Sequence, residues 1–157
     1  MKLLNKITSR NNIKKELVIG HGDLCFSNIL YHKSLKMLKL IDVKGAINEE
    51  ELYTNYYYDF AKLSHSICGR YDFFNSNQYQ ILLNNNSKFE LSINFNNKPY
   101  IQVFKKYLNE LGIDFNLVRI LEASLFLSML PLHIDYPQKV FGFILNAINI
   151  LDEVENE

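Results

Sequence analysis

The residues with the clearest capacity for chemistry lie in one short segment, His21-Gly22-Asp23-Leu24-Cys25-Phe26-Ser27-Asn28. A second acidic residue, Asp42, follows Asn28 after fourteen positions. This order of Asp, Asn and Asp matches the spacing of a phosphoryl-transfer site, in which the first Asp orients the acceptor hydroxyl. The Asn and the second Asp of such a site hold Mg²⁺ on the nucleotide phosphates. We therefore expect Asp23, Asn28 and Asp42 to belong to one site.

Each of these side chains also has an ordinary structural role. Asp23 carries a carboxylate that can accept a hydrogen bond from an attacking hydroxyl, or that can cap a turn. Asn28 offers a neutral carbonyl oxygen suited to Mg²⁺ and Asp42 a charged one, although both residue types are common in turns. Histidine titrates near neutral pH, so His21 could be a catalytic base or a support that hydrogen-bonds the loop from below.

The elements before this segment are a polar lead-in and one short apolar run. Residues 1–16 are mostly polar and basic, without the apolar stretch of a signal peptide. Residues 17–19, Leu-Val-Ile, are stopped by Gly20. A short apolar run that ends in glycine predicts a buried strand, which leads directly into the loop.

A small hairpin is expected to follow the loop. Residues 29–31 and 38–41 are apolar runs separated by a polar turn, which predicts two paired strands. Asn28 then stands at the start of the first strand, and Asp42 at the end of the second. The hairpin would bring both side chains to one rim, where a metal ion could lie.

The rest of the chain predicts mainly helices. Apolar residues at helical spacing indicate helices over 59–68, 73–83 and 101–111, a fourth that Asn116 caps and that ends near Pro131, and a fifth over 138–153. Gly112 stands where a C-terminal cap of the third belongs. The buried face of the last helix is predicted to consist of Val140, Phe141, Ile144, Leu145, Ile148 and Leu151.

Two segments are not expected to be helical. Residues 43–55 are predicted to form a loop with a solvated acidic run, and residues 89–95 alternate strictly, which predicts a half-buried strand without an obvious partner. His65 and Ser66 are expected to have a core or surface role. The predicted fold class is therefore mainly α with a small β-hairpin (α+β), in a single domain over residues 1–157.

The composition excludes several classes of partner. The chain has 17 basic and 17 acidic residues, so no net charge favours nucleic acid or anionic lipid. Its two cysteines, Cys25 and Cys68, cannot build a disulfide framework. The most apolar segment, residues 117–132, is too short and too interrupted by charge to span a bilayer. We expect a cytoplasmic protein that binds neither nucleic acid nor membrane.

Three motifs together carry a family resemblance. His21-Gly22-Asp23 with Asn28, then Ile41-Asp42-x-x-Gly45, then Tyr58-Asp59-Phe60-Ala61-Lys62-Leu63 closely resemble the aminoglycoside phosphotransferase and choline kinase family, which has a protein-kinase-like fold. The sequence around these motifs is most similar to that of bacterial phosphotransferases found with capsule and surface-polysaccharide genes. Residues 125–133 are similar to that subgroup as well. The resemblance covers His21 to the C-terminus.

The resemblance implies a role for each motif residue. It implies that Asp23 is the catalytic base, with His21 beside it, and that Asn28 and Asp42 are the magnesium ligands that hold the nucleotide. It implies that Asp59 supports the catalytic loop from within the protein. It also implies ATP or GTP as the phosphoryl donor, and a small hydroxylated, sugar-like acceptor.

The sequence also departs from a complete kinase of this type. Such a kinase has an N-terminal lobe with a Gly-rich loop over the phosphates and a strand Lys. The twenty residues before His21 contain no Gly-rich loop, so we expect a C-terminal lobe with the N-terminal lobe absent. The strand over 89–95 is extra to a minimal lobe, and we expect it to be an elaboration near the acceptor pocket.

Three functions stay open on the sequence. The first is the C-terminal lobe of a small-molecule kinase, acting on a sugar-like acceptor in polysaccharide biosynthesis. The second is a non-catalytic truncated lobe, or a subunit that needs a separate N-terminal lobe or a second copy of itself. The third is a metal-dependent phosphoesterase with His21, Asp23 and Asp42 as ligands, although two-metal sites usually recruit more His and carboxylate groups.

Overall fold

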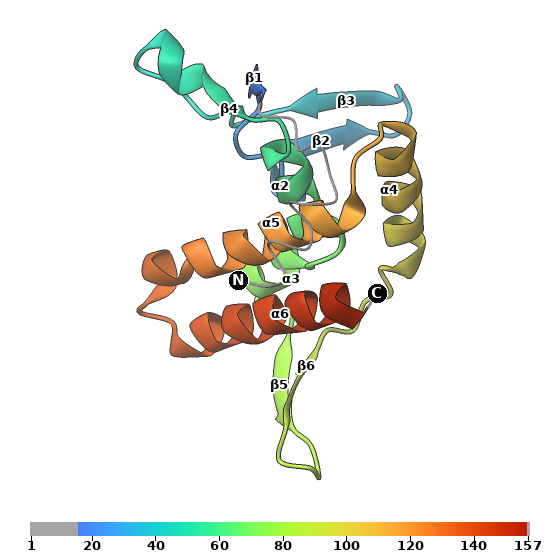
Figure 1. Ribbon diagram of the computed structural model, residues 1–157, viewed down its shortest axis with the longest axis vertical. Coiled ribbons are helices and arrows are strands. Elements are labelled where there is room, and N and C mark those ends of the chain that lie inside the picture. Colours follow the sequence, from blue (N-terminus) through green and yellow to red (C-terminus); the bar gives the residue numbers. More distant parts are fainter. Residues whose placement is uncertain (1–15, 157) are drawn as a thin grey trace.

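Two long helices, α5 (Phe115–Ser128) and α6 (Pro137–Asn156), form the centre of the molecule, because their apolar faces pack on each other. They run side by side across the middle of Figure 1. The structure, a computed structural model, describes residues 16–156, so nearly all of the predicted polar lead-in lies outside it. No helix within this range is both long and apolar enough to cross a membrane.

The elements around the candidate loop form two short antiparallel pairs. Strand β1 (Leu17–Ile19) pairs with β4 (Tyr53–Asn55), and β2 (Ile29–His32) pairs with β3 (Met37–Leu40). The hairpin predicted from the sequence is therefore confirmed. Figure 1 shows both pairs at one end of the molecule, on the same side of the central helices.

The sequence predicted that strand β1 would be buried, and this prediction was wrong. Leu17 and Ile19 are each 67% exposed, because β1 pairs only with β4 and no further described layer covers it. The loop predicted over residues 43–55 is also wrong in its second half. That half contains a short 3₁₀ helix, η2 (Glu49–Leu52), followed by β4.

Two further helices pack around α5. Helix α2 (Tyr58–Ile67) and helix α4 (Lys98–Glu110) confirm the helices predicted over 59–68 and 101–111, with small shifts at the ends. Gly112 follows α4 with a φ of 68°, the left-handed conformation that favours glycine after a helix. The buried cluster that joins these helices consists of Tyr57, Cys68, Phe104, Leu108, Ile113, Leu117 and Val118.

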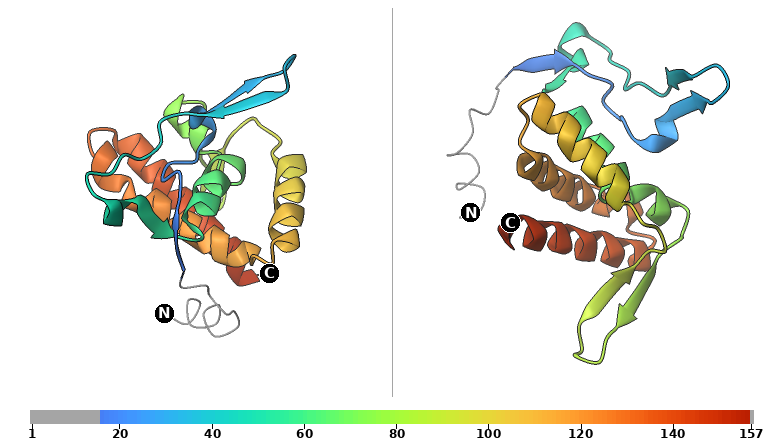
Figure 2. Two further views of the ribbon diagram at one scale, coloured as in Figure 1. Left: turned by 90° about the horizontal axis from the view of Figure 1, so that it is seen from above. Right: turned by 90° about the vertical axis from the view of Figure 1, so that its right-hand side faces the viewer.

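The helix predicted over residues 73–83 is wrong. Helix α3 (Tyr71–Asn75) is short, and Asn77 just beyond it has a φ of 55°, which an α-helix cannot accommodate. The chain then enters strand β5 (Gln80–Leu83), which pairs with β6 (Phe89–Ser92). The strand without an obvious partner thus has one, and Figure 2 shows the β5–β6 hairpin projecting away from the helices.

The cap predicted for α5 is displaced by two residues. The cap is Asp114, whose Oδ1 accepts hydrogen bonds from the backbone N–H of Asn116 at 2.7 Å and of Leu117 at 3.3 Å. A side-chain oxygen on the residue directly before the helix can reach these free amides, whereas Asn116 already lies inside the helix. Helix α5 ends before a 3₁₀ turn, η3 (Leu130–His133).

The buried face of α6 differs from the predicted one. Phe141 and Ile148 are exposed, whereas the buried residues are Gly142, Phe143, Asn146, Ala147, Ile150 and Val154. Small residues on this face allow close packing. A Cβ added to Gly142 would lie 2.9 Å from Cε1 of Phe74. The helix prediction itself, over 138–153, is confirmed.

A buried ionic group also joins the helices. Glu122 of α5 is fully buried, and its Oε2 accepts hydrogen bonds from Ser64 Oγ of α2 and from Nη1 of Arg119. The other end of the Arg119 guanidinium lies 2.8 Å from Oε2 of Glu153 in α6. Burial raises the pKa of Glu122 to about 7, against the lowering effects of Arg119 and Ser64. The fold is thus α+β, with helices held by an apolar core and one internal ion pair.

Candidate active site

The loop that carries Asp23 is anchored by the carboxylate of Asp59. Its Oδ2 accepts a hydrogen bond from the backbone N–H of His21 at 2.6 Å, and its Oδ1 accepts one from that of Gly22 at 2.9 Å. Asp59 lies in the first turn of α2, where a negative charge is also favoured by the helix dipole. Asp59, which is partly buried, thus holds the backbone of the loop at His21 and Gly22.

Two glycines allow this close approach. A Cβ on Gly20 would lie 2.6 Å from Cγ2 of Thr54 and 2.7 Å from Oδ2 of Asp59. Gly22 has a φ of 78°, and a Cβ there would lie 2.5 Å from Cβ of Lys44. The loop can follow this path only with residues that lack a side chain at these two positions.

Helix α2 presents a row of polar side chains to the loop. Asp59, Lys62 and Ser66 recur every three or four residues, so they share one face of the helix. Lys62 Nζ lies 2.8 Å from Oδ1 of Asp23. Ser66 Oγ accepts a hydrogen bond from the backbone N–H of Phe26 at 3.0 Å. The loop is thus held at both ends and at its central carboxylate by one helix face.

The Asp23 carboxylate is fixed from two sides. While Lys62 holds Oδ1, the Nδ2 of Asn28 donates to Oδ2 at 3.0 Å and to the backbone oxygen of Asp23 at 2.9 Å. The Asp23 side chain remains 40% exposed. This carboxylate is therefore oriented by the protein and still open to a hydroxyl group from solvent.

The ion pair keeps Lys62 charged. Burial alone lowers the pKa of Lys62, but the hydrogen bond and the charge of Asp23 outweigh that effect, so the pKa is raised above its usual value. A lysine cation thus stands permanently beside the Asp23 carboxylate at neutral pH. Its charge offsets that of the carboxylate across a contact of 2.8 Å.

His21 is buried, and both of its ring nitrogens form hydrogen bonds with backbone groups. Its Nδ1 accepts a hydrogen bond from the backbone N–H of Asp23 at 3.3 Å, and its Nε2 donates to the backbone oxygen of Ile41 at 3.0 Å. The contact with Ile41 joins the loop to the end of the hairpin. Of the two roles considered for His21, these contacts favour the supporting one.

Asn28 and Asp42 both lie at the open end of the β2–β3 hairpin. The backbone N–H of Ile41 donates to the backbone oxygen of Asn28 at 3.0 Å, and Asp42 is the next residue. Asp42 has a φ of 57° and an exposed side chain. The Oδ1 of Asn28 forms no hydrogen bond with the described part of the chain.

The site therefore brings its predicted residues together to different degrees. Asp23 and Asn28 are in direct contact, and Asp59 and His21 hold the same loop. Asp42 is a neighbour of this group through the backbone at Ile41, without a hydrogen bond or ion pair to it. Asn28 Oδ1 and the Asp42 carboxylate are hard oxygen donors of the kind that Mg²⁺ prefers, so both residues fit such an ion.

Two residues of the site were missed as functional residues. Lys62 occurs within a motif, but the sequence alone does not reveal its partner, and Ser66 was expected to have only a core or surface role. The signal that could have identified them is their spacing from Asp59, since three and seven positions along a helix return to the same face.

Two hollows lie beside the loop, and both are bordered by Phe26. One has a volume of about 310 Å³ and is wholly apolar, with Tyr100, Val103 and Tyr107 of α4 in its wall. The other has a volume of about 270 Å³ and is also bordered by Ser66, Asp72, Phe73 and Phe95.

Comparison with known proteins adds no relative. No family model, no curated protein and no solved structure matches the chain. The functional argument therefore depends on the contacts described above.

Proposed function

We propose that this chain is the C-terminal lobe of a small-molecule kinase with a protein-kinase-like fold. It transfers the γ-phosphoryl group of ATP or GTP to a hydroxyl group of a sugar-like acceptor. The observation that carries the proposal is the arrangement at Asp23, whose carboxylate is fixed by Lys62 and Asn28 but remains open to solvent. An oriented and accessible carboxylate is what alignment of an attacking hydroxyl requires.

Each side chain then has a defined part in the reaction. Asp23 accepts a hydrogen bond from the acceptor hydroxyl and takes its proton as the bond to phosphorus forms. Lys62 and the Nδ2 of Asn28 keep the carboxylate in position. Asn28 Oδ1 and Asp42 would hold magnesium, whose contribution is to neutralise charge on the phosphates. Asp59 and His21 maintain the loop that carries Asp23.

The motif resemblance supports the same class of reaction. The three motifs that resemble aminoglycoside phosphotransferases and choline kinases contain Asp23, Asn28, Asp42 and Asp59. Three of these four residues lie in one connected set of hydrogen bonds. Because the residues of these motifs are similar to those of capsule and surface-polysaccharide phosphotransferases, we propose that the chain acts in that biosynthesis, in the cytoplasm.

A second candidate function, a subunit that works only with a partner lobe, is favoured by one observation. The strands around the loop expose large apolar side chains: Leu17, Ile19, Tyr31 and Leu38 are each more than half exposed. Apolar strand surfaces of this kind are typical of faces that another protein segment covers. A lobe that clamps the nucleotide would lie against this end of the molecule.

The phosphoesterase alternative has less support. Within residues 16–156 no group of three His, Cys, Asp or Glu side chains is arranged to hold a metal ion. Both ring nitrogens of His21, one of its expected ligands, are occupied by backbone groups.

The decisive experiment is a transfer assay with matched variants. ATP or GTP labelled at the γ-phosphate is incubated with Mg²⁺, a panel of neutral sugars and the full chain, as wild type, Asp23→Asn or Asp152→Asn. Asp152 is exposed on α6 and serves as the control. We expect transfer by wild type and Asp152→Asn, and a loss of about 10²–10⁴-fold in Asp23→Asn. Equal transfer by Asp23→Asn would refute the assignment of the base.

The same assay separates the first two candidate functions. If wild type transfers no phosphate, calorimetry with Mg²⁺ and ATP determines whether the chain binds nucleotide by itself. Tight binding would count against the subunit hypothesis, and absence of both binding and transfer would support it.

A further inference from the structure

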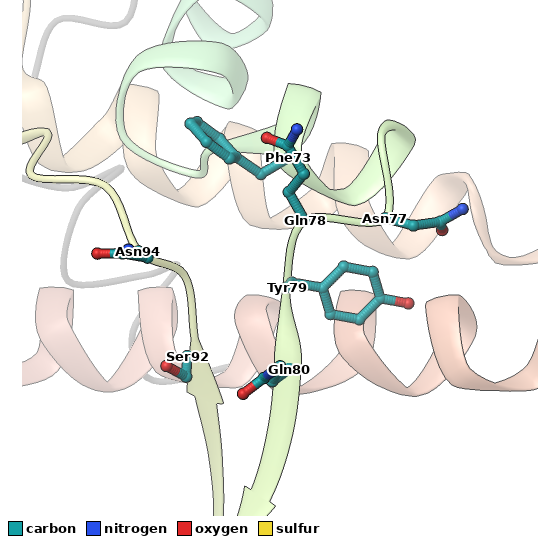
Figure 3. Close-up of a pocket in the computed structure, with 7 residues that line it drawn as sticks. All are labelled: Phe73, Asn77, Gln78, Tyr79, Gln80, Ser92 and Asn94. Carbon is teal, nitrogen blue, oxygen red and sulfur yellow. The ribbon is translucent and has the colours of Figure 1, made fainter.

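A hollow with a polar lining lies at the base of the β5–β6 hairpin, away from the Asp23 loop (Figure 1). Its volume is about 570 Å³, within the range of roughly 300–1,000 Å³ that is common for small-molecule sites. The residues that line it carry four side-chain amides, one serine hydroxyl and two aromatic rings (Figure 3). We call it the hairpin pocket.

Its chemistry is uniformly neutral. None of the side chains in its wall is acidic or basic, and burial raises the pKa of the one phenol, Tyr79, so that this group also stays uncharged at neutral pH. A charged ligand such as a phosphate would find no opposite charge there. An amide, by contrast, both donates and accepts hydrogen bonds, as a hydroxyl group does.

The polar groups are presented together. Gln80 lies directly opposite Ser92 in the register of the hairpin, so the two side chains share one face of it. In Figure 3 the side chains of Gln80, Ser92 and Asn94 all point to the same side. All three residues are exposed, and none of their side chains forms a hydrogen bond with the described part of the chain.

The strand behind these groups is held by packing. The side chain of Tyr79 turns to the other side in Figure 3, where its ring lies 4.8 Å from that of Phe74 in the buried core. Phe73 forms part of the pocket wall, and its ring lies 5.0 Å from that of Phe95. The polar face is therefore supported from behind and has an apolar ring at its side.

We propose that the hairpin pocket binds a neutral carbohydrate. Several amides and a hydroxyl match the many hydroxyl groups of a sugar, and the Phe73 ring offers an apolar surface to the C–H face of a sugar ring. The proposal does not depend on phosphoryl transfer, because no residue of the pocket belongs to the Asp23 loop. Phe73 also borders the smaller hollow beside Phe26, so a longer chain of sugars could extend toward that loop.

Calorimetry with the full chain tests this proposal. The probes are three neutral oligosaccharides, maltotriose, cellotriose and triacetylchitotriose, with glucose 6-phosphate as the charged comparison. We expect saturable binding of at least one neutral probe and a preference for it over glucose 6-phosphate. No binding of any neutral probe, or a preference for the phosphorylated sugar, would overturn the proposal.

Variants locate the binding. The double variant Gln80→Ala with Asn94→Ala is expected to weaken binding by about tenfold or more, because it removes two hydrogen-bonding amides. Asn85→Ala, at the turn of the same hairpin but outside the pocket, is the matched control and should bind as wild type does. Equal binding by the double variant and by wild type would place the carbohydrate elsewhere and refute the pocket.

Two further measurements keep the result interpretable. The circular dichroism spectrum of the double variant is expected to match that of wild type, since both replaced side chains are exposed. The variant Gln80→Glu keeps the size of the side chain but adds a charge, and it should also weaken sugar binding. The binding measurements contain no nucleotide, so no transfer takes place in them. Sugar binding therefore succeeds or fails independently of the phosphoryl-transfer function.

Discussion

Lys62 Nζ lies 2.8 Å from Oδ1 of Asp23, and this contact joins helix α2 to the loop that carries the candidate base. The lysine is only 15% exposed, whereas the aspartate is 40% exposed. A mostly buried cation thus holds a more exposed anion in place. The arrangement leaves the carboxylate of Asp23 accessible and makes Lys62 a positioning residue of the proposed reaction.

Replacing Lys62 is the first test of this relationship. We expect Lys62→Met to lower kcat for phosphoryl transfer by about 10–100-fold, because the Asp23 carboxylate loses its orientation, with a smaller change in KM. Lys106→Met, on the exposed face of α4, is the control and should leave both constants unchanged. Wild-type kcat in Lys62→Met would remove Lys62 from the site.

The anchor at Asp59 predicts a change in stability. Asp59→Asn keeps the shape of the side chain but replaces one of two accepting oxygens with a donor, opposite the N–H of His21 or Gly22. We expect the free energy of unfolding to fall by about 1–3 kcal/mol in urea denaturation. Asp152→Asn should change it by less than about 0.5 kcal/mol. Equal stability of the two variants would contradict the anchoring role.

Close packing around Gly20 predicts that alanine is not tolerated there. The added methyl group would lie 2.6 Å from Thr54 and 2.7 Å from Asp59, so one of the two must move. We expect a loss of about 1–3 kcal/mol in the free energy of unfolding, together with reduced transfer. Gly45→Ala is the control, since nothing lies within 4 Å of its added carbon. A Gly20→Ala variant as stable as Gly45→Ala would argue against this packing.

The buried ring of His65 predicts a specific pH dependence. Burial, and after it the charge of Lys62, lowers the pKa of His65 to about 3. Between the unfolded pKa of about 6.5 and the folded value, the unfolded chain binds a proton that the folded chain does not. The contribution of His65 to the free energy of unfolding therefore falls as pH decreases below about 6.5, with a slope of up to about 1.4 kcal/mol per pH unit.

The comparison with His65→Phe isolates this effect. A phenyl ring keeps the stacking on Tyr71 and the edge-to-face contact with Phe126. It removes two buried ring nitrogens that have no hydrogen-bond partner among residues 16–156. We expect urea denaturation to show similar or greater stability at pH 7, and a growing advantage of the variant at pH 6 and 5. His32→Phe, on an exposed strand, should show no such advantage. Parallel losses in wild type and His65→Phe would contradict the prediction.

The proposed metal ligands can be tested without turnover. Mn²⁺, which takes the same oxygen ligands as Mg²⁺, broadens nearby NMR signals. We expect the amide signals of Asn28 and Asp42 to broaden at lower Mn²⁺ concentration than those of α6, and Asp42→Asn to reduce the effect. Glu50→Gln, in the exposed acidic run, controls for unspecific binding. Broadening that Asp42→Asn leaves unchanged would exclude Asp42 as a ligand.

Local sequence patterns correctly predicted the elements in which the spacing of apolar residues agrees with the packing. The β2–β3 hairpin and α4 follow directly from apolar spacing and from the turn or glycine that ends each. The failures have physical causes. Residues 80–83 were predicted to continue a helix, because no glycine or proline marks the left-handed turn at Asn77 between α3 and β5. The buried face of α6 was missed because small residues, among them Gly142, face the core there.

The candidate site was predictable in part for the same reason. Asp23 and Asn28 are five residues apart, so their contact is local and the motif reveals it. The contact between Lys62 and Asp23 depends on how α2 packs against the loop, which no spacing in the sequence specifies. The direction of the Gln80 and Ser92 side chains likewise required knowledge of the pairing between β5 and β6.

The left-handed backbone at Asp42 has a consequence for which residues evolution or a mutagenesis library can accept at that position. Among amino acids with a side chain, Asp and Asn are the types that adopt a φ near 57° at least cost, and glycine adopts it freely. Selection for folding alone would therefore retain Asp, Asn and Gly. Selection for phosphoryl transfer would retain Asp only, so the difference between the two surviving sets measures the chemical role of this carboxylate.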